Sequence, residues 1–155
     1  MVMNDYEKIA EDCEISWIPD FQFTGEKYTQ VSGYIFNTKG QLLIVKNDDT
    51  WTIPGGHPEI NETQIETLHR ELMEEACVTI KEIKYLGAVK VIEKGDTYYQ
   101  VRYTALVDTE LPFKQEWEIS ERKFVDLSDL QNYVKWSNGV MFSRQIEDAR
   151  KIWKS

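Results

Sequence analysis

The sequence predicts an α/β domain in which helices cover both faces of a β-sheet. Three observations predict it: two β-hairpin patterns, a strongly periodic helix between them, and a second helical pattern near the C-terminal end. With 155 residues, of which 41% are hydrophobic, the chain can build one domain with a sizeable core. We therefore expect residues 1–155 to form a single domain.

Strand-forming residues occur in two pairs of runs. Each pair is separated by turn-forming residues, 37–40 in the first pair and 94–96 in the second. A further short strand fits residues 122–126. The paired runs cover residues 31–36 and 42–45, then 86–93 and 97–107.

The best helix prediction lies between the hairpins, over residues 63–76. Its apolar residues recur at helical spacing, and Thr63 with Glu66 has the spacing of a capping box. The residues that we expect on its buried face are Ile65, Leu68, Leu72 and Ala76.

The two ends of the chain carry weaker signals. Val140, Ile146 and Ile152 recur among polar residues, which predicts a helix over residues 138–153 in the C-terminal segment 138–155. A short helix fits residues 128–133. The N-terminal extension, residues 1–27, shows no clear element, and its Trp17 is expected to pack against the domain rather than contact a ligand.

Composition excludes several function classes. Eighteen basic against 27 acidic side chains give a net charge of −9, which argues against duplex nucleic acid or an anionic membrane as a partner. A phosphate substrate would need a cation as intermediary. No apolar run approaches the roughly 20 residues that span a bilayer. Two cysteines and an N-terminus without a signal-peptide pattern predict a cytoplasmic protein.

Three carboxylates share one face of the predicted central helix. Glu71, Glu74 and Glu75 stand at i, i+3 and i+4, a spacing at which hard oxygen ligands can converge on a divalent cation. A solvated acidic face is the ordinary interpretation of such a pattern. The turn-rich segment 51–56 upstream favours a ligand site instead, because its glycines permit close approach of the backbone.

Residues 56–78, GHPEINETQIETLHRELMEEACV, resemble the Nudix box. That pattern is Gly, five residues, Glu, seven residues, Arg-Glu, an aliphatic, any residue, Glu-Glu, any residue, Gly, an aliphatic. Cys77 stands where the pattern has its second glycine. Glycine just past a helix commonly supplies a left-handed turn, so the sequence leaves the geometry of the loop after this helix open. Asn61 is a milder departure. The residues in register are Gly56, Glu62, Arg70, Glu71, Leu72, Glu74, Glu75 and Val78.

The resemblance implies an α/β/α sandwich around a mixed sheet, and Mg²⁺ or Mn²⁺ as cofactor. It implies Glu71, Glu74, Glu75 and the main-chain carbonyl of Gly55 as metal ligands, with Glu71 also a candidate for deprotonating the attacking water. It further implies that Arg70 holds a carboxylate in place.

Two further sets of residues follow from the same resemblance. Gly56 and Glu62 are implied as the support of the loop and helix. A further catalytic glutamate is implied from a later loop, with Glu118 the first choice, Glu116 the second, and Glu121 also open. An ordinary acidic loop is the alternative interpretation of these residues.

The implied function is hydrolysis of a pyrophosphate bond in a small nucleoside diphosphate-linked substrate: a nucleoside triphosphate, a nucleotide sugar or a dinucleotide. The alternatives are an inactive domain of the same fold that binds ligands or regulates, and a structural acidic module. Arg102, placed opposite Lys90, is expected to face solvent, with a phosphate contact as the alternative. Cys77 is expected to be an inert buried thiol, and His57 and His69 lack metal-ligand spacing. Candidate base-stacking residues are Trp17, Trp51, Tyr98, Tyr99 and Trp117.

Overall fold

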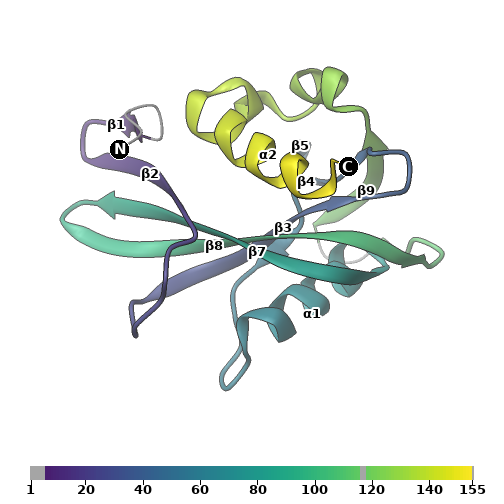
Figure 1. Cartoon of the computed structure of the whole chain (residues 1–155), viewed down its shortest axis with the longest axis horizontal. Coiled ribbons are helices and arrows are strands. Elements are labelled where there is room, and N and C mark those ends of the chain that lie inside the picture. The colour runs from purple at the N-terminus through teal and green to yellow at the C-terminus, as the bar shows by residue number, and fades with distance from the viewer. Residues whose placement is uncertain (1–5, 116–117, 155) are drawn as a thin grey trace.

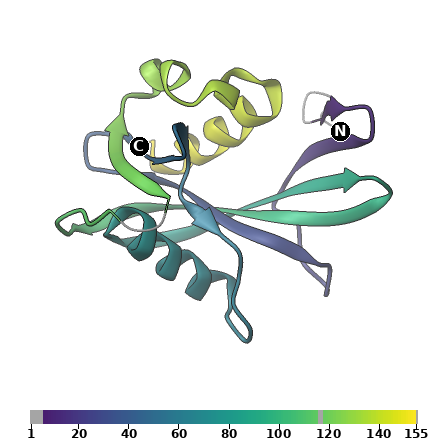
Figure 2. The same cartoon turned by 180° about the vertical axis from the view of Figure 1, so that it is seen from behind.

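The computed structural model describes residues 6–115 and 118–154. Within these residues, nine strands form one sheet that lies between two helical layers (Figure 1). Helix α1 (Gln64–Ala76) covers one face, and α2 (Val140–Trp153) covers the other (Figure 2). The predicted α/β/α sandwich is therefore confirmed.

The sheet is mixed. Its main path runs β1-β2-β7-β8-β3-β4-β5, while β6 pairs with β3 and β9 pairs with β4. Strands β3 and β8 are parallel, and the other pairs are antiparallel. The strands are β1 (Tyr6–Ala10), β2 (Cys13–Pro19), β3 (Tyr28–Phe36), β4 (Leu42–Asn47), β5 (Thr50–Thr52), β6 (Gly55–Gly56), β7 (Val78–Glu93), β8 (Asp96–Glu110) and β9 (Ile119–Val125).

Both predicted hairpins are present, but the second is longer than predicted. Strand β7 begins at Val78, directly after α1, eight residues before the predicted start at residue 86. Its first half is broken by register shifts and by Glu82 at a φ of 53°, and Lys81, Glu82 and Lys84 are exposed. These polar residues interrupt the alternation that would have identified the strand.

Helix α1 has the predicted capping box. The Thr63 hydroxyl accepts from the Glu66 N–H at 3.1 Å, and the Glu66 carboxylate accepts from the Thr63 N–H at 2.8 Å. Leu68, Leu72 and Ala76 are fully buried, as predicted. The prediction for Ile65 is wrong, because it lies at the margin of the apolar face and is 42% exposed.

The C-terminal region is helical, as predicted, with different boundaries. Two 3₁₀ segments, η2 (Leu127–Asn132) and η3 (Lys135–Asn138), precede α2. The buried face of α2 consists of Met141, Gln145 and Ala149, while Val140 and Ile152 are 53% and 40% exposed. A polar residue thus occupies the centre of the buried face, which an apolar pattern cannot reveal.

The N-terminal residues add two strands to the sheet, where the sequence showed no clear element. Trp17 in β2 is 2% exposed, and its Nε1 donates to Asp148 of α2 at 2.9 Å, so the packing interpretation is confirmed. From β1, the Glu7 carboxylate accepts from the Met141 N–H at 3.0 Å. The negative charge of Glu7 therefore lies at the amino end of α2, where it is favourable.

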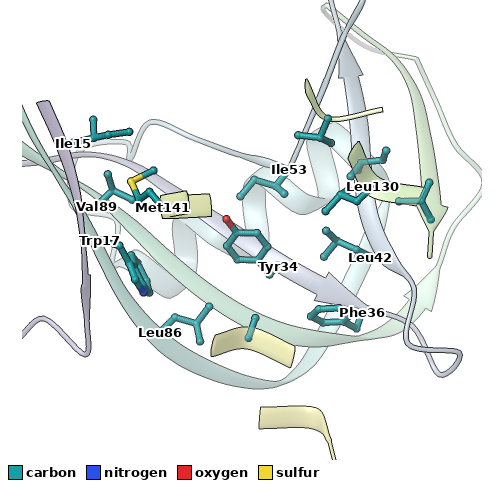
Figure 3. Packing of buried hydrophobic residues seen from close by; sticks show 14 of the residues in the cluster. Ile15, Trp17, Tyr34, Phe36, Leu42, Ile53, Leu86, Val89, Leu130 and Met141 are labelled. Carbon is teal, nitrogen blue, oxygen red and sulfur yellow. The ribbon is translucent and has the colours of Figure 1, made fainter. Parts of the chain in front are cut away.

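Two hydrophobic clusters fill the space on either side of the sheet. The cluster under α2 includes Trp17, Tyr34, Leu42 and Met141 (Figure 3), and the one under α1 includes Leu68 and further strand residues. In the described part of the chain, no helix is both long and apolar enough to cross a membrane.

Two apolar residues of α1 differ in burial, so their replacement should lower the free energy of unfolding by different amounts. Leu68→Ala should lower the free energy of unfolding by about 2–5 kcal/mol, because it leaves a cavity against the sheet. Ile65→Ala should change it by less than about 0.5 kcal/mol, because that side chain is largely in solvent. Urea denaturation followed by circular dichroism measures both, and equal losses would contradict the packing of α1.

Candidate metal and substrate site

The acidic face of α1 contacts the two glycines of β6. Helical spacing brings Glu71, Glu74 and Glu75 to one side of the helix, next to the buried side that packs on the sheet. Gly55 and Gly56 form β6, which pairs with Val31 and Ser32 of β3. The helix and the turn together hold the carboxylates against the backbone.

Arg70 donates hydrogen bonds to three carboxylates of this region. Its Nε donates to Glu62 at 2.6 Å, and its Nη1 donates to Glu71 at 2.9 Å and to Glu74 at 3.2 Å. Its Nη2 donates to the main-chain carbonyl of His57 at 2.9 Å. All of these are charge-assisted bonds from a donor with fixed geometry, so Arg70 sets the positions of the carboxylates around it.

Glu62 joins the loop after β6 to the helix. Besides Arg70, it accepts from the Thr67 hydroxyl at 2.7 Å and from the Glu59 N–H at 2.9 Å. The hydrogen bond from Arg70, aided by those from Glu59 and Thr67, lowers the pKa of Glu62 to about 2. Glu62 therefore stays ionised under all ordinary conditions.

The two glycines of β6 allow the carboxylates to approach the backbone. The Gly55 N–H donates to Glu75 at 2.9 Å. A Cβ on Gly56 would overlap the Glu71 carboxylate, and a Cβ on Gly55, whose φ is +157°, would overlap Ser32. A side chain at either position would displace the groups that line the site.

Burial changes the proton affinity of two of these glutamates. Desolvation, reinforced by the charges of Glu71, Glu74 and Glu118, raises the pKa of Glu75 to about 7 against the effect of the Gly55 N–H. Desolvation also raises the pKa of Glu71, and Arg70 opposes that shift. Near neutral pH, the negative charge of Glu75 is therefore costly without a nearby cation.

Glu118, the first-choice distal glutamate, lies at this site. It lines a cavity of about 200 Å³ together with Glu71, Glu74, Glu75 and Ile119. We call this the carboxylate cavity. Glu121 instead forms an ion pair with Lys46 at 4.0 Å, and Glu116 lies outside the described residues.

The departures from the box pattern preserve its backbone geometry. Cys77 ends α1 with φ 55° and ψ 43°, the left-handed conformation that glycine commonly provides, and Asn61 has a φ of 67°. Arg122 donates to the carbonyls of Ala76 and Cys77 at 2.6 and 3.2 Å, which stabilises the helix end. The Cys77 side chain is buried, as predicted.

The donor set of the carboxylate cavity fits a divalent cation such as Mg²⁺. Four carboxylates around one small cavity offer hard oxygen ligands, and the desolvated Glu75 would gain from a neighbouring positive charge. Among the described residues, no three acidic, histidine or cysteine side chains are already grouped for coordination. Arg70 donates to Glu71 and Glu74, and the Gly55 N–H donates to Glu75.

The expectation for Arg102 is wrong. It is 4% exposed, and it pairs with Gly87 across β7 and β8, whereas Lys90 pairs with Tyr99. Its guanidinium donates to the side-chain oxygens of Gln145, Gln30 and Gln100 at 3.2, 3.0 and 3.3 Å. Arg102 therefore lies between the sheet and α2, surrounded by neutral acceptors.

Most of the candidate base-stacking residues pack against other side chains of the protein or line a different cavity. Tyr99 is buried and stacks on Phe21, and Trp51 packs edge-on against Tyr133. Tyr98 lines a second cavity, while Trp117 lies outside the described residues. His57 and His69 are both exposed, and neither lines the carboxylate cavity.

Comparison with known proteins identifies the family. A sequence model of the NUDIX domain matches residues 27–144. The chain belongs to the Nudix family. It is 36% identical over 58 residues to the RNA pyrophosphohydrolase of Halorhodospira halophila, a match that covers 36% of this chain and 32% of that protein. The match thus spans about a third of the length of that curated relative.

Solved Nudix structures share the fold. A mutant of the Bacillus subtilis pyrophosphohydrolase superposes with a TM-score of 0.76 at 19% identity, covering 91% of this chain and 92% of that one. The NUDIX domain of Shewanella oneidensis NrtR, in complex with ADP-ribose, gives 0.65 at 23% identity, covering 86% and 91%. At these identities the likeness establishes the fold of this Nudix chain.

The raised pKa of Glu75 predicts a stability change with pH. Between its ordinary pKa of 4.5 and about 7, the folded protein keeps a proton that the unfolded chain has released. The free energy of unfolding of the metal-free protein should therefore fall as pH rises through this window, by about 3 kcal/mol at most. Melting temperatures at pH 5 and pH 8 in EDTA measure it. The fall should be smaller in Glu75→Gln, and an equal fall in both proteins would contradict the assignment.

Proposed function

We propose that this Nudix protein hydrolyses a pyrophosphate bond in a nucleoside diphosphate-linked substrate and that it requires Mg²⁺ or Mn²⁺. The observation that carries this proposal is the carboxylate cavity, where Glu71, Glu74, Glu75 and Glu118 meet. Crowded, partly desolvated carboxylates destabilise a protein unless a cation compensates them. The clustered carboxylates and the Nudix-box spacing of the helix glutamates together support a catalytic metal site.

The residues have separate roles in this proposal. Glu71, Glu74 and Glu75, with the main-chain carbonyl of Gly55, hold the cation. Arg70 and Glu62 fix the carboxylates and the loop through the bonds described above. When bound, the cation supplies positive charge to the diphosphate and acidifies the attacking water. Glu71 or Glu118 accepts the proton of that water.

The substrate is proposed as a class. Nucleoside triphosphates, nucleotide sugars and dinucleotides all contain the bond, and the ADP-ribose bound to the NrtR domain is a nucleoside diphosphate of this kind. The RNA pyrophosphohydrolase relative adds the 5′ end of RNA as a candidate. The net charge of −9 argues against an extended contact with RNA or duplex DNA, so any polynucleotide would be held by its end.

An inactive ligand-binding domain is the competing function. It would bind a nucleotide without metal-dependent turnover. The carboxylates argue against it, because a domain without turnover has no physical need for four clustered acidic groups.

We also propose a cytoplasmic location. Cys13 and Cys77 are both free thiols, which is compatible with a reducing compartment.

Removal of the metal should abolish turnover. With a panel of nucleoside triphosphates, nucleotide sugars, dinucleotides and 5′-triphosphorylated RNA, EDTA should stop hydrolysis, and added Mg²⁺ should restore it. Product identification and phosphate or pyrophosphate release measure the reaction. Full turnover in metal-free buffer would overturn the mechanism.

A matched pair of variants tests the metal ligands. Glu75→Gln keeps the size of the side chain but removes its charge, so turnover should fall by more than about 100-fold, beyond the loss usual for residues that only support a ligand. Glu66→Gln should change turnover little, because glutamine also serves in a capping box and Glu66 does not line the carboxylate cavity. Steady-state kinetics and melting temperatures are compared with the parent. Near-parental turnover in folded Glu75→Gln would refute the proposed ligand set.

A further inference from the structure

The loop between β8 and β9 carries Glu118 to the carboxylate cavity. Of this loop the structure describes residues 111–115 and 118, and Glu118 lines the cavity directly before β9 begins at Ile119. The other three carboxylates of the cavity belong to α1, whose helical geometry fixes their spacing. Glu118 comes from a different element, so its distance from them depends on how the loop is held against α1.

Arg122 of β9 contacts the carboxyl end of α1. Its Nη1 donates to the main-chain carbonyls of Ala76 and Cys77 at 2.6 and 3.2 Å. Carbonyls at the end of a helix have no helical N–H partner. Bonds from a guanidinium are charge-assisted, and positive charge is favourable at this end of a helix. Arg122 therefore joins β9 to the helix that carries Glu74 and Glu75.

The same guanidinium contacts the beginning of the loop. Its Cζ lies 5.7 Å from the centroid of the Phe113 ring, a cation–π distance, and its Nη2 forms an ion pair with Glu110 at 3.8 Å. Glu110 is the last residue of β8, and Phe113 packs on the hydrophobic cluster under α1. The Arg122 side chain is 16% exposed, so these contacts are partly shielded from water. One side chain thus contacts the helix, the end of β8 and the loop.

Cys77 binds the first half of the loop at the same place. Its main-chain carbonyl accepts from the Leu111 N–H at 2.9 Å, and its Sγ accepts from the Lys114 N–H at 3.4 Å. Sulfur is a weak acceptor, so the second bond supports the anchor without forming it alone. The box pattern has glycine at this position, and glycine has no side chain. A chain that follows the pattern therefore lacks the contact with Lys114.

Glu118 lies midway between these two anchors. It is four residues after Lys114 and four residues before Arg122, and four residues span at most about 14 Å. Its main-chain carbonyl also accepts from the Asp48 N–H at 3.4 Å, which holds it beside the β4–β5 turn. Asp48 does not contact α1 in this way, so the distance between Glu118 and the helix is set by Arg122 and Cys77.

We propose that Arg122 is a positioning residue for the reaction, supported by Cys77. Together they hold the β8–β9 loop against the end of α1, so that Glu118 stays where it can act on the attacking water. This inference rests on the proposed function, because it assigns how one glutamate of that site is placed. Arg122 does not line the carboxylate cavity, so it acts through the loop and not on the substrate.

Steady-state kinetics with Mg²⁺ and an accepted substrate test the role of Arg122. Arg122→Met keeps an unbranched side chain but removes the charge and the donors, so kcat should fall about tenfold or more with KM within about threefold. Arg122→Lys keeps the charge and should recover part of that loss. Glu118→Gln should itself lower kcat. In that background, Arg122→Met should lower kcat by less than about twofold more, because the carboxylate that it positions is already gone.

A stability control and a structural measurement separate positioning from a general loss of stability. Val134→Ala, in the cluster under α2, should lower the melting temperature but leave kcat within about twofold of the parent. In the metal-free protein, NMR hydrogen exchange at the Leu111 and Lys114 amides should be about tenfold or more faster in Arg122→Met, and within about twofold of the parent in Val134→Ala. Cys77→Ala should accelerate exchange at Lys114 by a smaller factor, because only the Sγ acceptor is lost.

Three results would overturn the inference: parental kcat in folded Arg122→Met, an equal loss of kcat when that change is added to Glu118→Gln, or parental exchange at both loop amides. If Arg122→Met does not fold, Arg122→Lys and Cys77→Ala provide the same comparisons. If no substrate is hydrolysed but exchange at both amides rises in the Arg122 variants, the proposed function fails and the loop anchor stands. If substrates are hydrolysed and Glu118→Gln keeps parental kcat, the inference fails and the proposed function stands on the glutamates of α1.

Discussion

The ion-pair network around Arg70 is the interaction on which the arrangement of the site depends. Its guanidinium contacts Glu62, Glu71 and Glu74 and the carbonyl of His57, so one cation joins α1 to the loop after β6. One positive charge does not neutralise three carboxylates, and Glu75 adds a fourth nearby. The site thus retains an excess negative charge in a partly desolvated place, which a bound divalent cation would compensate.

Backbone geometry supplies the second constraint. Asn61 and Cys77 adopt left-handed conformations before and after α1, and Gly55 and Gly56 leave room for the carboxylates. A cysteine in this conformation costs on the order of 1 kcal/mol relative to glycine. Arg122, through its bonds to the carbonyls of Ala76 and Cys77, and the burial of the thiol offset that cost. The helix therefore ends as the family pattern requires without its glycine.

Local patterns predicted the hairpins, the central helix and its capping box, because these depend on residues close in sequence. Tertiary packing decides that Ile65 is exposed and that a polar residue occupies the centre of the buried face of α2, so local patterns did not predict either. The start of β7 was missed because exposed lysines interrupt its strand pattern. Spacing alone placed the three glutamates of α1 on one face. The position of Glu118 required the resemblance, and the burial of Arg102 required the pairing of β3 with β8.

The central claim is that the acidic face of α1 binds a divalent cation. Titration of the metal-free protein with Mn²⁺, followed by the electron paramagnetic resonance signal of the free ion, tests it most directly. We predict saturable binding at pH 8 that weakens at pH 6, where Glu75 holds a proton. We also predict at least about tenfold weaker binding in Glu75→Gln. Binding that does not saturate, or that is equally tight in Glu75→Gln, would contradict the account.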